Sequence, residues 1–389
     1  MRLIVMCGKG GVGKSTLTAA LGVKAAALGQ RTLVFSVDPA HSLALALDAK
    51  LGPFPEPVAD KLWGAELEAI EEIDANWGDV KDYFLTLMQS QGLDNRLGGE
   101  LSSLPGINEF AALIKLKQYI DSNQFDTIIL DNAPTGFALR LLSLPSIFNW
   151  YAKQAIKLYE RHGAQLMMMI PMVGASIPIP SSNVIGRAVG LAEQLKDLPL
   201  IIANPEITST RLVMTPDKLA HEEAKQAYRY LCLYGLNADE VYVNQTLPEG
   251  VTDPFFASRK AAQAAVREQV KTDFAPLPVR EVPMQPEAVI GLEALRRLAD
   301  SIWPDGNPTA PQSDDRSLTI TPQDGQILVS IKLPFVGPKD VDLAKFENEL
   351  YITIGNHRRT LLLPPDAADM QPIKAKFSEG RLLVTLARS

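Results

Sequence analysis

The stretch Gly8-Lys9-Gly10-Gly11-Val12-Gly13-Lys14-Ser15-Thr16 decides the fold of this chain. It follows an apolar run at residues 3–7 and opens a helical pattern over residues 15–28. Between a buried strand and a helix, a loop of the form G-x-x-x-x-G-K-[ST] surrounds a phosphate with backbone N–H groups, and the helix dipole adds to the attraction. The stretch therefore predicts a site for ATP or ADP with Mg²⁺. The residues expected to contact the nucleotide or its metal are Gly10, Gly11, Val12, Gly13, Lys14, Ser15 and Thr16.

The two lysines of this loop are expected to have different roles. Lys14 should reach the β- and γ-phosphates, while the adjacent Ser15 ligates Mg²⁺. Lys9 has no acidic residue close to it in the sequence, so the two like charges repel each other until an anion binds. Lys9 is therefore expected either as a solvated side chain or as a residue that crosses to the nucleotide of a neighbouring subunit.

Short apolar runs farther along the chain each end in a polar residue. Such runs are typical of parallel strands buried on both faces, and helical patterns at residues 109–120 and 217–234 lie between them. This alternation predicts a doubly wound, mostly parallel α/β sheet, in which ligands bind beyond the carboxyl ends of the strands. The runs are residues 32–37 before Asp38, 127–130 before Asp131, 212–214 before Thr215 and 241–243 before Asn244.

Two of these polar residues are carboxylates that suit phosphoryl transfer. Asp131 is placed to hold Mg²⁺ through its water shell, and Asp38 is placed to orient or deprotonate the attacking water. Because phosphoryl transfer depends mostly on positioning and charge neutralisation, a phosphate loop, a metal and one base are sufficient. An aspartate also often ends a strand for structural reasons alone. Taken with the loop, the pattern makes Asp38, Lys9 and Lys14 the catalytic candidates, and Ser15 and Asp131 the metal ligands.

The loop resembles the deviant Walker A motif with its signature lysine. Partition ATPases, the nitrogenase iron protein and the ATPases of arsenite pumps and tail-anchored-protein targeting share this motif, and the chain is most similar to the last group over residues 1–303. Asp38-Pro39-Ala40-His41-Ser42 resembles that group's switch I motif, and residues 132–145 resemble its switch II signature. Other similar segments are residues 104–109, which match a Pro-Gly-x-x-Glu element, and residues 244–248, 274–278 and 282–284, which match adenine-side elements.

This resemblance implies a homodimeric ATPase whose two nucleotides lie at the subunit interface. Lys9 would then reach across the interface, and Asp38 would activate the attacking water. Asn244 would contact the adenine, with Pro283 and Met284 nearby.

The chain also departs from this family. Ser42 occurs where switch I often has asparagine, and Phe137 occurs where switch II usually has histidine. The zinc-binding CxxC of animal and fungal targeting factors is missing from residues 253–259, as is the cysteine trio that binds arsenite. The two cysteines of the chain, Cys7 and Cys232, are far apart in the sequence, which predicts neither a thiolate metal site nor a disulfide framework. The energising ATPase of a metalloid efflux system is the alternative function.

Residues 66–115 and 146–200 correspond to helical insertions that form a hydrophobic client groove in the targeting ATPases. The second insertion contains Met167-Met168-Met169-Ile170-Pro171-Met172. Because methionine is unbranched and polarizable, methionine-rich surfaces suit varied apolar partners, although these residues would also fill a helical core. The resemblance favours a client surface for membrane-protein segments or a lipid-like ligand, with transient contact to a membrane or receptor.

The last part of the chain differs in composition. Residues 304–316 are rich in proline and polar residues and predict a linker. Residues 317–389 alternate apolar and polar side chains with a period of two, which predicts a small all-β sandwich. Within it, residues 331–341, 349–354 and 375–386 resemble the α-crystallin domain of small heat-shock proteins, and an unrelated sandwich is the alternative. The resemblance implies a fused helper or lid module.

Composition excludes several other classes. The 389 residues are 46% hydrophobic and 21% charged, which indicates a globular protein of two or three domains. With 38 Lys and Arg against 45 Asp and Glu, the net charge of −7 argues against nucleic-acid binding and against a DNA-patterning partition ATPase. Residues 163–186 are uncharged, but Pro171, Pro178 and Pro180 would interrupt a membrane-spanning helix. Without a signal-peptide pattern at its start, the sequence predicts a soluble cytoplasmic protein.

Overall fold

A computed structural model describes residues 1–38, 40–67, 107–132, 182–323 and 325–388. Most of the predicted insertions, including the methionine run at residues 167–172, lies outside these described residues, and so do Phe137 and the rest of the switch II signature after Asn132. Of the helices within them, none combines the length and the hydropathy needed to cross a bilayer.

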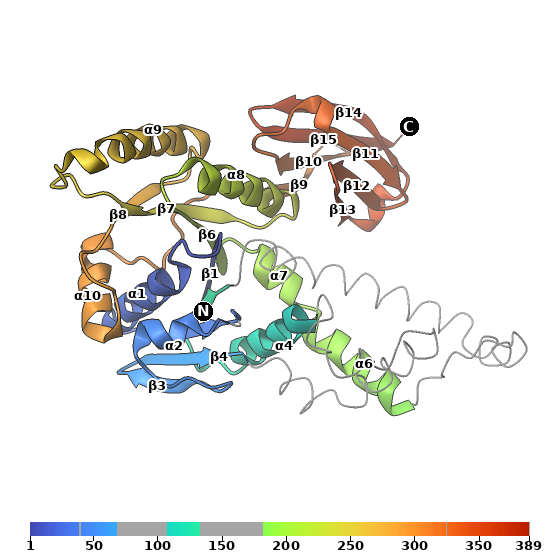
Figure 1. Ribbon diagram of the computed structural model, residues 1–389. Helices are drawn as coiled ribbons and strands as arrows, with labels where there is room; N and C mark the ends of the chain where they lie inside the picture. Colours follow the sequence, from blue (N-terminus) through green and yellow to red (C-terminus); the bar gives the residue numbers. More distant parts are fainter. Residues whose placement is uncertain (39, 68–106, 133–181, 324, 389) are drawn as a thin grey trace, which may run out of the picture.

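A large sheet forms the centre of the molecule. Among the described residues, eight strands form it in the order β3-β4-β2-β5-β1-β6-β7-β8, and every neighbouring pair except β3–β4 is parallel (Figure 1). The predicted doubly wound, mostly parallel sheet is confirmed. Its strands are β1 (Arg2–Gly8), β2 (Thr32–Ser36), β3 (Glu56–Ala59), β4 (Leu62–Glu66), β5 (Thr127–Asp131), β6 (Thr208–Met214), β7 (Ala238–Thr246) and β8 (Val279–Pro283).

Helices cover both faces of this sheet, and each face has its own hydrophobic core. One core joins the sheet to α1, α2 and α10, and the other joins the opposite face to α4, α7, α8 and α9. Within β1, Leu3, Val5 and Cys7 enter one core, whereas Ile4 and Met6 enter the other. Burial on both faces explains why the strands are uniformly apolar. The helices are α1 (Lys14–Ala27), α2 (Ser42–Leu47), α4 (Ile107–Asp121), α6 (Ser182–Leu195), α7 (Leu198–Ala203), α8 (Lys218–Leu233), α9 (Ala257–Asp273) and α10 (Gly291–Ile302).

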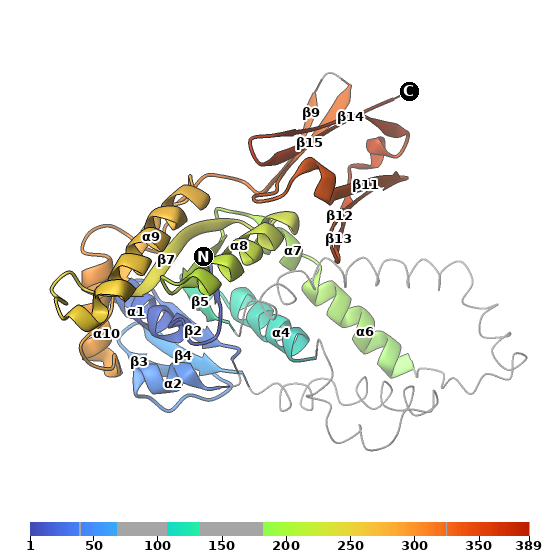
Figure 2. The same cartoon turned by 45° about the horizontal axis from the view of Figure 1, so that its top comes forward.

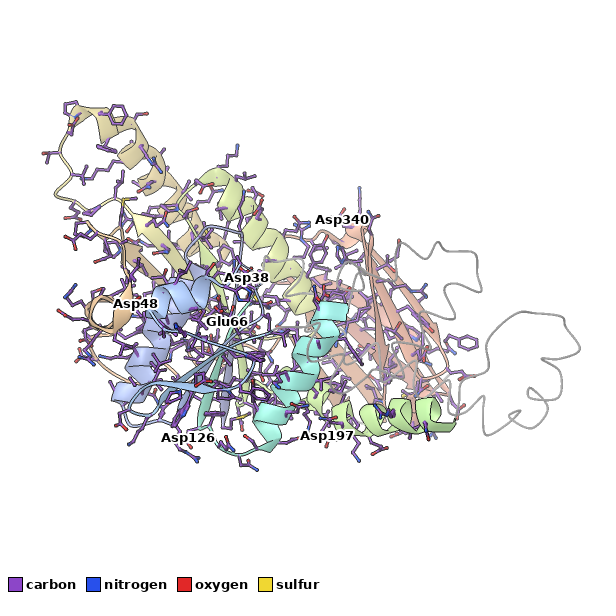
Figure 3. All side chains as sticks on the ribbon, turned by 60° about the horizontal axis from the view of Figure 1, so that its bottom comes forward. Asp38, Asp48, Glu66, Asp126, Asp197 and Asp340 are labelled. Atoms are coloured by element: carbon purple, nitrogen blue, oxygen red, sulfur yellow. The ribbon has the colours of Figure 1, made fainter. Side chains whose placement is uncertain are left out.

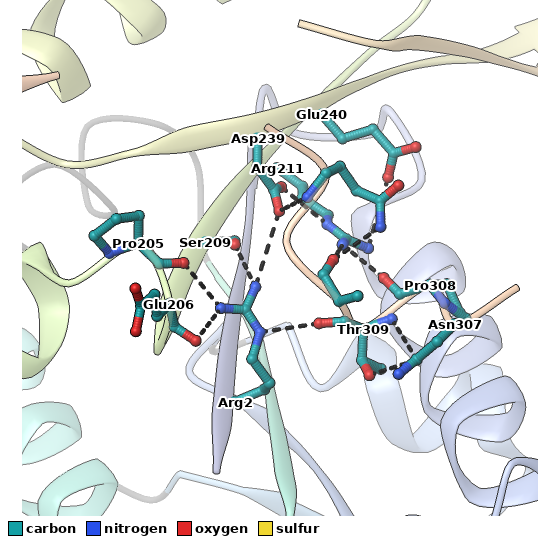
Figure 4. Close-up of polar contacts among 12 residues, drawn as sticks. Arg2, Pro205, Glu206, Ser209, Arg211, Asp239, Glu240, Asn307, Pro308 and Thr309 are labelled. Atoms are coloured by element: carbon teal, nitrogen blue, oxygen red, sulfur yellow. Dashed lines mark hydrogen bonds and ion pairs between the residues drawn. The ribbon is translucent and has the colours of Figure 1, made fainter. Parts of the chain in front are cut away.

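Two strands begin earlier than their apolar runs predict, because charged residues occupy buried positions in them. Arg211 of β6 is fully buried, and its Nε lies 3.2 Å from Asp239 Oδ1 of β7. Its Nη1 lies 3.6 Å from Glu240 Oε2 (Figure 4). Arg280 of β8 donates to the other oxygen of Glu240 at 2.8 Å. Burial alone would lower the pKa of Arg211, but Tyr242, Asp239 and Glu240 more than offset it and raise that pKa. Ion pairs between buried charged residues therefore allow β6 and β7 to begin before their apolar runs.

The segment predicted as a linker, residues 304–316, is docked on this charge cluster. Arg211 Nη2 donates to the Pro308 carbonyl at 2.6 Å, and Arg2 Nε donates to the Thr309 carbonyl at 2.9 Å (Figure 4). Thr309 is only 1% exposed. Carbonyl groups of this proline-rich segment hydrogen-bond to the buried Arg211 and to the partly buried Arg2, which lie in another part of the chain.

The C-terminal residues form the predicted small β-sandwich. Its two antiparallel sheets have the orders β14-β15-β10-β9 and β11-β12-β13 and enclose one apolar core. Tyr230 and Leu233 of α8 belong to this core, so the sandwich rests against α8 (Figure 2). Its strands are β9 (Leu318–Gln323), β10 (Gln326–Lys332), β11 (Val341–Phe346), β12 (Glu349–Ile354), β13 (His357–Leu362), β14 (Met370–Ser378) and β15 (Arg381–Arg388).

Candidate functional site

The phosphate loop connects the central strand β1 to α1. Gly11 and Gly13 have φ angles of 81° and 92°, in the left-handed region that favours glycine. The Leu17 N–H donates to the Gly13 carbonyl at 3.0 Å, so the helix begins directly after the loop. The loop thus has the strand-loop-helix geometry that phosphate binding by backbone N–H groups requires.

Gly8 permits the close approach of β1 and β6 below this loop. A methyl group at position 8 would overlap the carbonyl oxygen of Val213 on β6. We expect Gly8→Ala to force the two backbones apart, to cost roughly 1–3 kcal/mol of stability, and to weaken ATP binding. Thermal unfolding and titration calorimetry measure these two effects. Gly250→Ala is the matched control, because nothing lies within 4 Å of a methyl group there. Equal behaviour of the two variants would contradict this account.

Lys14 and Asp131 form the buried part of the site. Lys14 is 6% exposed, and its Nζ donates to the Lys9 carbonyl at 2.9 Å. Burial lowers the pKa of Lys14, while the nearby carboxylates of Asp131 and Asp38 oppose that shift. Burial likewise raises the pKa of Asp131 to about 6, and the hydroxyl of Ser15 and the ammonium of Lys14 oppose it. The structure therefore brings Lys14, Ser15, Asp131 and Asp38 into one electrostatic cluster.

Unsatisfied polar atoms in this cluster fit a bound Mg²⁺. Asp131 is fully buried, and although Ser36 Oγ donates to its Oδ2 at 3.2 Å, its Oδ1 has no hydrogen-bond partner. The adjacent Asn132 is also buried, and neither Oδ1 nor Nδ2 of its side chain has a partner. Buried polar groups are normally satisfied, and carboxylate and hydroxyl oxygens are the ligands that Mg²⁺ prefers. Asp131 and Ser15 are therefore suited to hold the metal. Asn132 was not singled out from the sequence, although it directly follows Asp131.

Asp38 follows β2 and opens a tight turn. Its Oδ1 accepts the Ala40 N–H at 3.0 Å, and its own N–H donates to Ser36 Oγ at 3.3 Å. Because β2 and β5 are parallel neighbours, the residues that follow both strands reach the same edge of the sheet. Asp38 thus lies at the edge of the sheet that carries the phosphate loop, near enough for its carboxylate to act on Lys14, and its role in hydrolysis stays a prediction.

Glu66 anchors the segment that follows Asp38, and sequence reasoning missed it. Glu66 ends β4 and is 4% exposed. Its Oε2 lies 2.9 Å from His41 Nδ1, and its Oε1 accepts the Ala44 N–H of α2 at 2.9 Å. Figure 3 shows Asp38 and Glu66 close together, with Asp126, which precedes β5, far from both. The sequence around Glu66 does not indicate its contacts with His41 and Ala44. These contacts become visible only when β4 is placed beside β2 in the sheet.

Lys9 has an acidic partner, which corrects the expectation from the sequence. Lys9 Nζ lies 3.2 Å from Glu223 Oε1 of α8, and each side chain is 38% exposed. The sequence suggested no balancing charge because Glu223 is far away along the chain.

Asn244 lies against the phosphate loop from the end of β7. Its Nδ2 donates to the Val12 carbonyl at 2.8 Å, and a methyl group at Gly13 would overlap that Nδ2. Pro283 is exposed at the end of β8, and the Met284 N–H donates to the Thr246 carbonyl at 2.9 Å. Contact of these three residues with an adenine stays a prediction.

The two cysteines do not contribute to the site. Cys7 and Cys232 are both buried, and burial raises the pKa of each thiol to about 12. The thiolate is the form that binds metals and metalloids, and a thiol whose pKa is raised stays protonated near neutral pH. Neither cysteine is therefore suited to bind a metal or metalloid.

Comparison with known proteins gives two family matches. Residues 1–303 match the family described as anion-transporting ATPase, and residues 324–386 match the HSP20-like domain found in ArsA. The chain is 33% identical over 399 residues to putative arsenical pump-driving ATPase 1 of Aquifex aeolicus, with 100% of both chains covered. It is 31% identical over 381 residues to putative arsenical pump-driving ATPase of Chlorobaculum tepidum, covering 97% of this chain and 94% of that one. ATPase GET3A of Arabidopsis thaliana is 26% identical over 325 residues, covering 82% and 88%.

Proposed function

Because this chain belongs to the anion-transporting ATPase family and is an ATPase, we propose that it is a homodimeric targeting factor for apolar clients. In this proposal, Mg·ATP binding and hydrolysis close and open a hydrophobic groove formed by the two insertions. Its client is a membrane-protein segment or a lipid-like ligand, which it delivers through transient contact with a membrane or receptor.

One observation carries this proposal: the segment that follows Asp38 is hydrogen-bonded to the residue at which the first predicted insertion begins. Glu66, the first residue of that insertion, binds His41 and the N–H of Ala44 in α2, three and six residues after Asp38. A change at Asp38 that follows the state of the nucleotide therefore has a short mechanical route into the insertion. A nucleotide shifts the equilibrium between the open and the closed groove only if its affinity for the two states differs. The contacts of Glu66 with the segment after Asp38 are a means of coupling that difference to the insertion.

The described residues support a division of roles in hydrolysis. Backbone N–H groups of residues 10–15 and the Lys14 ammonium bind the phosphates. Asp38 orients the attacking water and accepts its proton, while Lys9 adds positive charge from the neighbouring subunit. Ser15 and Asp131 would hold Mg²⁺, which would neutralise charge on the phosphates.

The alternative function, energising a metalloid efflux system, is favoured by the names of the two relatives called arsenical pump-driving ATPases. Arsenite binds thiolates, and both thiols of this chain are buried with raised pKa values. The burial of both thiols therefore argues against direct binding of arsenite by this chain.

Capture of an apolar peptide by the full chain tests the proposed function. The probe is a fluorescent leucine-rich peptide of about 20 residues, the length that spans a bilayer. Its control is the same peptide with four leucines changed to aspartate. We expect Mg·ATP and Mg·ADP to give different affinities for the leucine-rich peptide, and the control peptide not to bind. Equal binding of both peptides, or hydrolysis stimulated by arsenite without peptide capture, would contradict the proposal.

A further inference from the structure

The amino-terminal end of α8 lies beside the phosphate loop and holds Lys9. Lys9 Nζ lies 3.2 Å from Glu223 Oε1, and Asp217, which caps the helix by accepting the Ala220 N–H at 2.9 Å, is also within electrostatic reach of Lys9. Both contacts are made within one subunit. The Lys9 ammonium therefore has carboxylate partners before any nucleotide of a second subunit is available.

The carboxyl-terminal end of α8 is held by the β-sandwich. Arg359 Nη1 of β13 donates to the Leu233 carbonyl at 2.5 Å, where a cation interacts favourably with the helix dipole. The ring centroids of Tyr230 and His357 are 3.7 Å apart. A methyl group at Gly235, just beyond the helix, would lie 2.8 Å from Arg359 Nη2, so the guanidinium fits closely against the end of the helix.

Side chains of α8 belong to the cores of both domains. Tyr228 is buried in the core of the large sheet, and its ring lies 6.5 Å from Phe335 of the C-terminal domain. Lys332 of β10 lies over the Tyr228 ring at 5.1 Å. Leu233 is fully buried in the core of the sandwich. Because packed interiors transmit displacement, α8 cannot shift without disturbing the sandwich.

We propose that α8 controls the availability of Lys9: Glu223 holds the Lys9 ammonium within its own subunit, and the C-terminal sandwich fixes the helix that carries Glu223. The inference deepens the proposed function, because Lys9 is the residue expected to reach the partner's nucleotide. An ammonium bound to Glu223 does not bind a phosphate across the interface at the same time, so the two contacts compete. The sandwich thereby acts on the nucleotide site without touching a nucleotide.

Amine labelling of the full chain without nucleotide tests this inference. The variant is Glu223→Gln, which removes the negative charge and keeps the size of the side chain. The matched control is Glu222→Gln, on the same helix, whose carboxylate pairs with Lys225 at 3.3 Å instead. With acetyl N-hydroxysuccinimide and peptide mass spectrometry, we expect Lys9 to be acetylated about two- to fivefold faster in Glu223→Gln, the range of one exposed ion pair. Glu222→Gln should label like the wild type, and an unchanged rate at Lys9 in Glu223→Gln would overturn the inference.

The role of the sandwich has its own variants. Arg359→Leu removes the donor to the Leu233 carbonyl, and we expect faster labelling of Lys9 as in Glu223→Gln. Arg359→Lys keeps a cation at the end of the helix and should restore the slow rate. If Arg359→Leu labels like the wild type while Glu223→Gln does not, the sandwich has no part in holding Lys9. These measurements need neither hydrolysis nor a client, so their result is independent of the peptide experiment.

Competition also predicts an effect on assembly. In sedimentation experiments with Mg·ATP, Glu223→Gln should strengthen dimer formation by about two- to fivefold, because Lys9 is released for the partner. In a Lys9→Ala background the same substitution should have no effect. An equal effect in both backgrounds would show that Glu223 acts through another residue and would overturn the inference.

Discussion

Asp38→Asn is expected to lower the turnover of ATP at least about a hundredfold, the usual contribution of a positioned base, while leaving the ATP dissociation constant unchanged. Asparagine keeps the size of the side chain and an oxygen that accepts the Ala40 N–H, which Asp38 Oδ1 accepts at 3.0 Å, so the turn is preserved. The amide, however, does not take a proton from water. The phosphates are bound by the loop and Lys14, which the substitution does not touch.

Single-turnover hydrolysis and titration calorimetry separate these two effects. Asp48→Asn is the matched control: Asp48 is an exposed carboxylate at the end of α2, with φ 50°, a conformation that asparagine tolerates. It should hydrolyse ATP like the wild type. Undiminished turnover in Asp38→Asn would remove Asp38 from the mechanism.

Arg211→Leu is expected to destabilise the protein by about 3–5 kcal/mol, the usual cost of removing one partner from a buried ion pair. The substitution leaves Asp239 and Glu240, which are 3% and 1% exposed, without the guanidinium that lies between them. It also removes the donor to the Pro308 carbonyl, which secures residues 304–316. Leucine has the hydrophobicity of a core residue but satisfies none of these groups.

Urea unfolding, followed by the shift of the midpoint, measures this loss. Arg31→Leu is the matched control, because Arg31 forms an ion pair with Asp126 at 2.7 Å but both side chains are about half exposed. An exposed pair contributes about 0–1 kcal/mol. Similar losses in the two variants would show that burial is not what makes the Arg211 cluster important.

The bounds of helices and strands could be predicted from the sequence where the buried positions carry apolar residues. Helix α1 and the strands β1, β2 and β5 begin and end within one or two residues of the ranges that their apolar patterns predict. The starts of β6 and β7 were predicted too late, because Arg211, Asp239 and Glu240 break the apolar runs. These charged residues are tolerated in buried strands because Arg211 of β6 forms ion pairs with Asp239 and Glu240 of the neighbouring β7.

The candidate site was predicted in part. The sequence indicated that the glycines, Lys14, Ser15, Asp38 and Asp131 would lie together, because a phosphate loop and residues that end parallel strands meet at one edge of the sheet; their roles stay predictions. Glu66 and Asn132 were not singled out. Glu66 matters because it binds His41 and the Ala44 N–H, and Asn132 matters because its buried side chain has no hydrogen-bond partner. Neither property can be read from the residue type or from the spacing of nearby residues.

By itself, the sequence determined the phosphate loop, the two kinds of sheet and the carboxylates beside the loop. These features depend on backbone conformation and on the period of apolar side chains, both of which are properties of neighbouring residues. Only the tertiary structure decided the partners of the charged side chains: Arg211 with Asp239, His41 with Glu66, and Lys9 with Glu223. An ion pair forms only when two charged groups lie within a few ångströms of each other. The fold of the chain decides which groups come that close, and residues far apart in the sequence can therefore form a pair.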